Sequence, residues 1–173
     1  RIPKRIEGYD WSGVLQGNTS KNIPSSFVPI KELPQILNPK HGYLFNTNNT
    51  PFNAAHPEDN LDESDFDSLI GFQEKDNNRS ARFEELIAEY PKISYAELKR
   101  IKYDVQYPDS LIGQFQLNDV FRIEASLYPK LTDIILLIQN WNRRADVENI
   151  GAAQWSIYYK YLIKKAKKHD LYG

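Results

Sequence analysis

The residues best suited to chemistry form a run of hydrogen-bonding side chains, Asn-Thr-Asn-Asn-Thr, at positions 46–50. Gly42 allows a strand to begin at the next residue, and Pro51 stops that strand because proline has no amide hydrogen to give to a sheet. The sequence therefore predicts a short strand over residues 43–45 that ends in a polar tip. Such a tip fits a functional site, although by composition alone an ordinary surface loop is the commoner case, because asparagine favours turns.

The chain on both sides of this tip is rich in turns. Residues 1–30 contain six glycines and prolines, which predicts short extended pieces joined by turns. Residues 54–78 are polar and acidic, but their carboxylates lack the Asp-x-Asp-x-Asp-Gly spacing of a calcium loop. We expect a solvated loop there, and a strand- and loop-rich segment over residues 1–78 as a whole.

Helical patterns begin near residue 79. Apolar side chains recur at i, i+3, i+4 and i+7 within residues 83–90, and Pro91 then ends the helix. Ser94 and Glu97 have the spacing of a capping box, which predicts the start of a second helix.

Three more helices are expected further along the chain. One lies around residues 118–127, and one lies over residues 131–141, where apolar side chains on nearly every side predict burial. The last begins near residue 150 and has lysines toward its end, where they interact favourably with the helix dipole. Residues 79–173 should therefore form a helical segment. A strand-bearing part followed by a helical part defines an α+β fold class.

Composition excludes several classes of function. The 173 residues include 22 basic and 23 acidic ones, a net charge of −1, so nucleic acid is not an expected partner. Cysteine is absent, which rules out disulfides and thiolate chemistry. His41, His56 and His169 are far apart in the sequence, so we expect no metal site and no cofactor. No apolar run is long enough for a membrane span.

Several motifs in a fixed order resemble one family, the penicillin amidases and acyl-homoserine-lactone acylases, which are N-terminal-nucleophile hydrolases. The resemblance covers nearly the whole chain and implies a part of their αββα fold. It departs from the family at Ile23 and the following Pro-Ser-Ser, where relatives commonly have a tryptophan, which affects substrate preference. The helical half also resembles the family, through Arg79 and through Trp141-Asn142-Arg143, where relatives have Trp-Asp-Arg. In the first half the matching motifs are Ile2-Pro3-Lys4-Arg5, Gly8, Asp10, Gly17, Leu33-Pro34, Asn38-Pro39, Gly42-Tyr43 and Asn48-Asn49-Thr50-Pro51.

The resemblance implies a mechanism. In the family, the N-terminal serine of the large chain attacks an amide carbonyl, its own amino group acts as base, and an asparagine stabilises the oxyanion. Asn48 falls at the position of that asparagine, which makes it the candidate catalytic residue. The sequence begins with Arg1 and contains no methionine. We therefore expect an internal segment of the large chain that contributes the oxyanion asparagine but not the nucleophile, and that is inactive alone.

The family also implies partners and a location. Its members are made as a zymogen that cleaves itself after export, so the expected partners are the small chain and the rest of the large chain, in the periplasm or outside the cell. The expected substrate is an acylated amine, such as an N-acyl-homoserine lactone or a β-lactam antibiotic. A non-catalytic helical protein-interaction domain remains the alternative. It accounts for the helices, but not for the order of the matching motifs.

Overall fold

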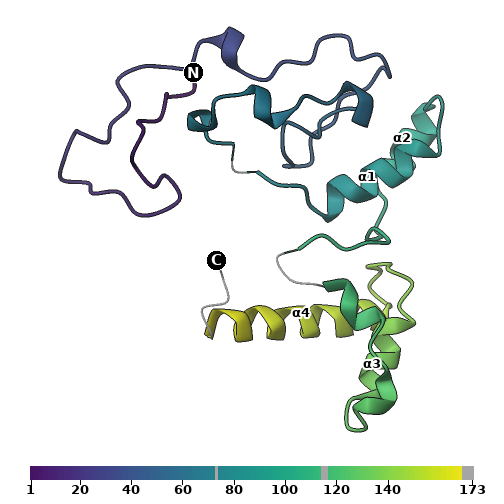
Figure 1. The fold of residues 1–173 in the computed structure, drawn as a ribbon. Coiled ribbons are helices and arrows are strands. Elements are labelled where there is room, and N and C mark those ends of the chain that lie inside the picture. The colour runs from purple at the N-terminus through teal and green to yellow at the C-terminus, as the bar shows by residue number, and fades with distance from the viewer. Residues whose placement is uncertain (73, 114–116, 169–173) are drawn as a thin grey trace. The chain divides into compact units, whose positions relative to one another are not determined.

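A computed structural model describes residues 1–72, 74–113 and 117–168. The chain divides into two compact units, Arg1–Asp76 and Asn77–Gly173. In Figure 1 the first unit is drawn mainly as irregular coil with short helical turns, whereas the second contains the helices α1 to α4. Each unit is described separately below.

The first unit is built from loops and single helical turns. Its described residues form 3₁₀ helices at Ile30–Glu32, Pro57–Asp59, Glu63–Asp65 and Ser68–Ile70. An isolated bridge joins Pro3 to Phe27. Among its described residues the buried apolar side chains are few, namely Val28, Ala55 and Ile70. Local hydrogen bonds, more than a large apolar core, therefore hold this unit together.

The strand expected over residues 43–45 is not formed. The Phe45 amide donates across the loop to the Ala54 carbonyl at 2.9 Å. A β-ladder needs a paired partner along its length, and the described residues 43–45 form none. In the described residues the fold is thus mostly helical with isolated bridges, and the strands of the α+β expectation are not confirmed.

The helices α1 (Asn78–Ala88) and α2 (Tyr95–Lys102) begin at side-chain caps. Asn77 accepts hydrogen bonds from the first amides of α1, and Ser94 forms the expected capping box with Glu97. These caps satisfy amide groups that have no partner inside the helix. Both predicted helices are confirmed, and the two pack against each other in Figure 1.

The helix expected around residues 118–127 is wrong in detail. The chain forms two 3₁₀ helices there, Leu117–Phe121 and Ala125–Leu127. The Gln139 side chain donates to the carbonyls of Val120 at 3.2 Å and Ile123 at 2.7 Å. A distant side chain therefore bonds to carbonyls that a continuous α-helix would use in its own ladder.

The core of the second unit lies between α3 (Thr132–Gln139), α4 (Ile150–Lys168) and the 3₁₀ helices. Trp155 of α4 stacks on Trp141 at 5.9 Å and on Phe121 at 5.7 Å between ring centroids. Within α3, Ile135 and Ile138 are buried. Ile134 and Leu136 are 44% and 43% exposed, so the expectation that this helix is buried on several sides is wrong.

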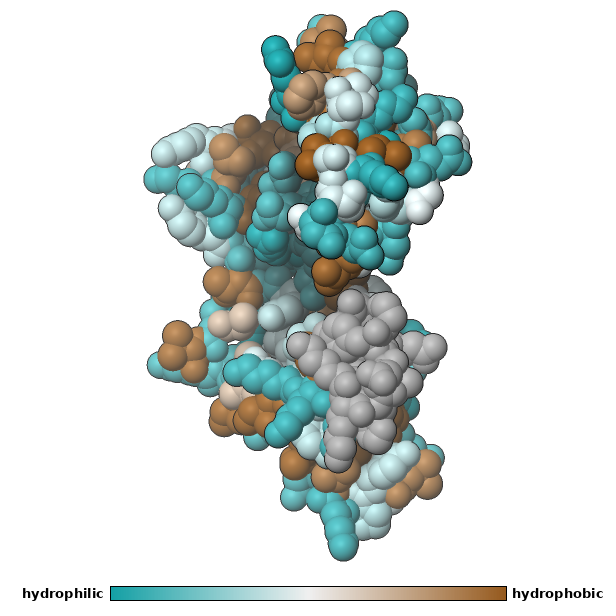
Figure 2. Space-filling view, turned by 90° about the vertical axis from the view of Figure 1, so that its left-hand side faces the viewer, coloured by the Kyte–Doolittle hydropathy of each residue, from teal (hydrophilic) through white to brown (hydrophobic). Residues whose placement is uncertain are grey.

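Apolar side chains also reach the surface. Brown apolar residues interrupt the teal polar surface at several places on the face in Figure 2. Exposed examples are Val14, Leu37, Val147, Ile150 and Ile157. In the part of the chain that the structure describes, no helix is both long and apolar enough to cross a membrane.

Candidate active site

Asn48 lies in a tight turn at the tip of the loop formed by residues 43–55, the Asn-rich loop. Its backbone has φ of 60°, in the left-handed region, which asparagine tolerates better than most residues. The Asn48 amide donates to the Asn46 side-chain oxygen at 2.7 Å, which closes an Asx turn. The Asn48 residue is exposed. Asn46 therefore supports the turn that presents Asn48.

Asn49 holds the Asn-rich loop from the inside. It is buried, with 8% of its surface exposed. Its side-chain oxygen accepts from the Thr47 amide at 2.8 Å and from the Thr47 hydroxyl at 3.0 Å. Its side-chain nitrogen donates to the carbonyls of Asn53 and Thr50. Asn49 therefore has a structural role, since its side-chain oxygen and nitrogen both form hydrogen bonds within the loop.

A second group of amides fixes the base of the loop. The Asn60 side-chain oxygen accepts from the amides of Ala54 and Ala55, at 3.0 and 2.9 Å. Asn60 also donates to the Asn53 side chain at 3.2 Å, and Asn53 in turn donates to Asp76 at 3.0 Å. Because buried amides need partners, this network keeps the return half of the loop in one conformation.

Two histidines meet beside this base. The His41 and His56 rings stack with centroids 3.5 Å apart and planes at 13°. The Asp59 carboxylate accepts from the amides of Lys40 and His41, at 3.1 and 2.8 Å, and lies 2.9 Å from His41 Nδ1. The hydrogen bond from the His41 amide is the main cause that lowers the pKa of Asp59.

The expectation that the histidines are too scattered to act together is therefore wrong for His41 and His56, whereas His169 lies outside the described residues. His41 lies four positions before Phe45 and His56 two positions after Ala54, the two residues whose hydrogen bond closes the loop. Both histidines are therefore only a few residues from the hydrogen bond that closes the loop, and this spacing predicts that they are neighbours. The prediction can be made only once the pairing of Phe45 with Ala54 is known.

Other aromatic and acidic residues of the first unit have local structural partners. The Trp11 indole donates to the Ile6 carbonyl at 2.9 Å, and the Arg5 guanidinium lies over the Trp11 ring at 5.8 Å. Asp62 and Asp67 cap the 3₁₀ helices that follow them. These contacts explain the positions of Trp11 and of both carboxylates through folding alone.

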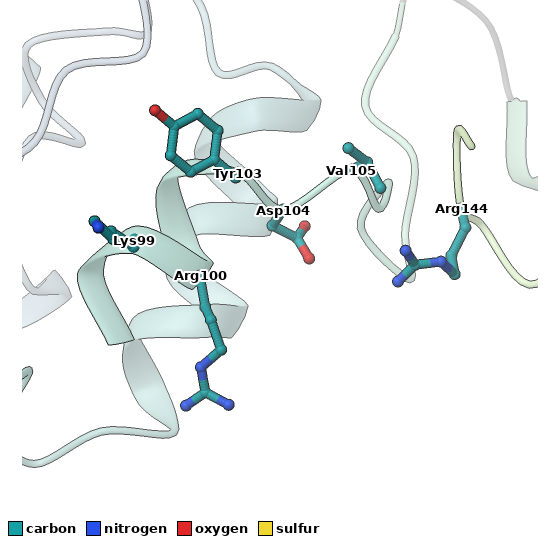
Figure 3. Close-up of a pocket in the computed structure, with 6 residues that line it drawn as sticks. All are labelled: Lys99, Arg100, Tyr103, Asp104, Val105 and Arg144. Atoms are coloured by element: carbon teal, nitrogen blue, oxygen red, sulfur yellow. The ribbon is translucent and has the colours of Figure 1, made fainter. Parts of the chain in front are cut away.

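The second unit contains a pocket of about 380 Å³ that the sequence did not predict. Figure 3 shows side chains from α2 and its C-terminal end on one side and Arg144 on another segment. Burial alone would raise the pKa of Asp104, but hydrogen bonds from Arg82 and from the Gln106 amide outweigh burial and lower it. Arg144 is paired with Asp146 at 2.6 Å. The lining residues are Lys99, Arg100, Tyr103, Asp104, Val105 and Arg144.

Comparison with known proteins identifies the class. Residues 1–172 match the penicillin amidase family. The chain therefore belongs to that family, a family of amidases with the N-terminal-nucleophile hydrolase fold, and the resemblance of its motifs is confirmed. No solved structure matches the chain.

Proposed function

We propose that the chain is a segment of an acylase that cleaves an acyl group from an amine through an acyl-enzyme, and that Asn48 is its oxyanion donor. The observation that supports this role is the exposed, left-handed turn in which the Asn-rich loop presents Asn48, closed by the Asn46 side chain and supported from inside by Asn49. Family membership supplies the reaction class.

The chemistry needs an amide donor at a fixed place. When a nucleophile attacks an amide carbonyl, the oxygen gains negative charge, and a donor already in position stabilises that charge without reorganising. The left-handed backbone of Asn48, closed by Asn46 and held from inside by Asn49, provides such a preorganised position. In this proposal the nucleophilic serine and its amino group come from another part of the protein.

The proposal extends to the whole enzyme. The segment would combine with a small chain and the rest of a large chain, produced from an exported zymogen and located in the periplasm or outside the cell. Its substrate would be an acylated amine, such as an N-acyl-homoserine lactone or a β-lactam. On this basis, the 173-residue chain alone hydrolyses none of these substrates. Family membership supports the acylase over a non-catalytic interaction domain.

The test is a kinetic comparison of variants in the intact, processed enzyme. Asn48→Gly is the sharper change, because glycine adopts positive φ without strain, so only the side chain is lost. Loss of an oxyanion donor should lower kcat by about 10²–10³, or roughly 3–4 kcal/mol, with a smaller change in KM. Asn46→Ala removes the acceptor that closes the turn and should lower kcat less than Asn48→Gly, whereas the exposed Asn18→Ala is the matched control and should leave kcat unchanged. Near wild-type kcat in Asn48→Gly would contradict the role.

A further inference from the structure

Three metal-binding side chains gather at the base of the Asn-rich loop. One ring nitrogen each of His41 and His56 and a carboxylate oxygen of Glu58 all lie within 4.8 Å of one another. His41 Nε2 is 3.7 Å from Glu58 Oε2. Two ligands whose bonds to one metal are about 2.0–2.2 Å long lie only slightly closer together than this. A small movement of the His41 and Glu58 side chains would therefore bring this pair into ligating range.

His41 is already held in the tautomer that a metal at Nε2 requires. Its Nδ1 lies 2.9 Å from Asp59 Oδ2, and an ionised carboxylate only accepts hydrogen bonds, so Nδ1 carries the proton. The lone pair is then on Nε2. A carboxylate that orients a histidine in this way is the usual outer partner of a metal-bound imidazole.

The charge around the donors also permits a cation. Glu58 has Lys40 as a neighbour, with Nζ 3.7 Å from the carboxylate, and both side chains are mostly exposed, at 79% and 66%. Such exposed pairs contribute little to stability, so a divalent ion can replace the lysine at small cost. Asp59 beside His41 adds a second negative charge.

We propose that His41, His56 and Glu58 bind one Zn²⁺, with water as the fourth ligand. Two imidazoles and one carboxylate suit Zn²⁺, whereas Ca²⁺ and Mg²⁺ prefer oxygen donors alone. The ion would join residues 15 positions apart and so fix the two ends of the Asn-rich loop. This proposal does not rest on the oxyanion role of Asn48.

Binding requires one ring to turn. A metal lies in the plane of each imidazole that ligates it, and the two rings are nearly parallel at 13°, so they cannot share an ion as they stand. His56 is the ring that moves, because His41 is fixed by Asp59. In doing so, His56 gives up the hydrogen bond that its Nδ1 accepts from the Glu58 amide at 3.2 Å. Zn²⁺ therefore separates the stacked pair.

The first experiment is a Zn²⁺ titration of the purified protein by calorimetry. We expect one saturable site, and we expect His41→Gln and His56→Gln each to weaken binding at least about 10-fold. The exposed carboxylate variant Glu63→Gln is the matched control and should bind like wild type. Wild-type affinity in His41→Gln or His56→Gln, or no saturable binding in wild type, would overturn the site.

Two further measurements separate ligation from loss of folding. Asp59→Asn keeps all three ligands but removes the charge that orients His41, and should weaken Zn²⁺ binding about 10–100-fold. In wild type, Zn²⁺ should shift the imidazole ring resonances of His41 and His56. Effective competition by Ca²⁺, or unshifted resonances of His41 and His56 at saturation, would exclude ligation by imidazole.

Discussion

At the scale of single residues, Asn48 and Asn49 are adjacent in the sequence but have different environments. Asn49 is buried and uses its oxygen and its nitrogen inside the loop, whereas Asn48 is exposed in a left-handed turn. The sequence identifies Asn48 as the candidate catalytic residue through its match to the family motif. It could not give the backbone conformation, because that depends on hydrogen bonds within the loop, from the Asn48 amide to Asn46 and from the Thr47 hydroxyl to Asn49. The strand propensity of residues 43–45 favoured an extended backbone instead.

Asn49 should matter for stability. Asn49→Ala removes a buried side chain that accepts two hydrogen bonds from Thr47 and donates to the carbonyls of Asn53 and Thr50. The free energy of unfolding should fall by roughly 1–3 kcal/mol, the usual cost of an unsatisfied buried group. Urea denaturation measures this change in the free energy of unfolding. The exposed Asn18→Ala is the control and should change it by less than about 0.5 kcal/mol, so equal effects of the two variants would contradict the role of Asn49.

Asp59 should make stability depend on acid pH. Hydrogen bonds from the His41 amide and side chain hold the pKa of Asp59 below its ordinary value of 3.8. A lowered carboxylate pKa stabilises the fold above the ordinary value, and that contribution is lost as pH falls through the lower native pKa. Asp59→Asn should therefore be less stable than wild type at pH 7, and the difference should shrink below pH of about 4.

The measurement is the denaturation midpoint of both proteins between pH 7 and pH 2. Asp65→Asn, which changes an exposed carboxylate of a nearby 3₁₀ helix, serves as the control. A difference between Asp59→Asn and wild type that stays constant over the whole range would exclude the carboxylate as its source.

At the scale of elements, the helices that could be predicted are those specified by their own residues. Asn77 and Ser94 cap α1 and α2, and α1 ends before Pro91. Where a helix prediction is wrong, the cause is a contact with residues that are distant in the sequence. Gln139 divides the region of residues 117–127 into two 3₁₀ helices, and α3 has only one buried face because its core partners lie on one side. Local patterns contain no information about such contacts.

Gly151 lies where α4 packs closely against Trp141. A Cβ at Gly151 would lie 2.7 Å from Trp141 Cβ, closer than real contacts allow, and this part of the tryptophan cannot swing away. Although alanine favours helix over glycine, Gly151→Ala should lower stability by about 1–3 kcal/mol through overpacking. Thermal unfolding followed by tryptophan fluorescence measures it.

Gly17→Ala is the matched control, because a Cβ there has no atom within 4 Å and should be nearly neutral. If Gly151→Ala were as stable as wild type or more so, the close packing of α4 on Trp141 would be wrong.

At the scale of the whole molecule, the two units are stabilised by different means. The second unit has a contiguous apolar cluster that includes Ile138, Trp141 and Trp155, all at most 5% exposed. The first has few buried apolar side chains and relies on side-chain amides and carboxylates that bond to nearby backbone. Since apolar burial contributes most to stability, the units should open with different free energies.

Hydrogen exchange read by mass spectrometry should resolve this difference. Amides of α4 around Trp155 should exchange slowest, because they open only when the tryptophan cluster does. Amides of residues 8–20, which lie in turns with mostly exposed side chains, should exchange fastest. Within the first unit, the amides of Ala54 and Ala55 should be slower than those turns, because Asn60 accepts both hydrogen bonds. Asn60→Ala should remove that local protection and leave α4 unchanged, whereas uniform protection along the chain would mean that both units unfold as one.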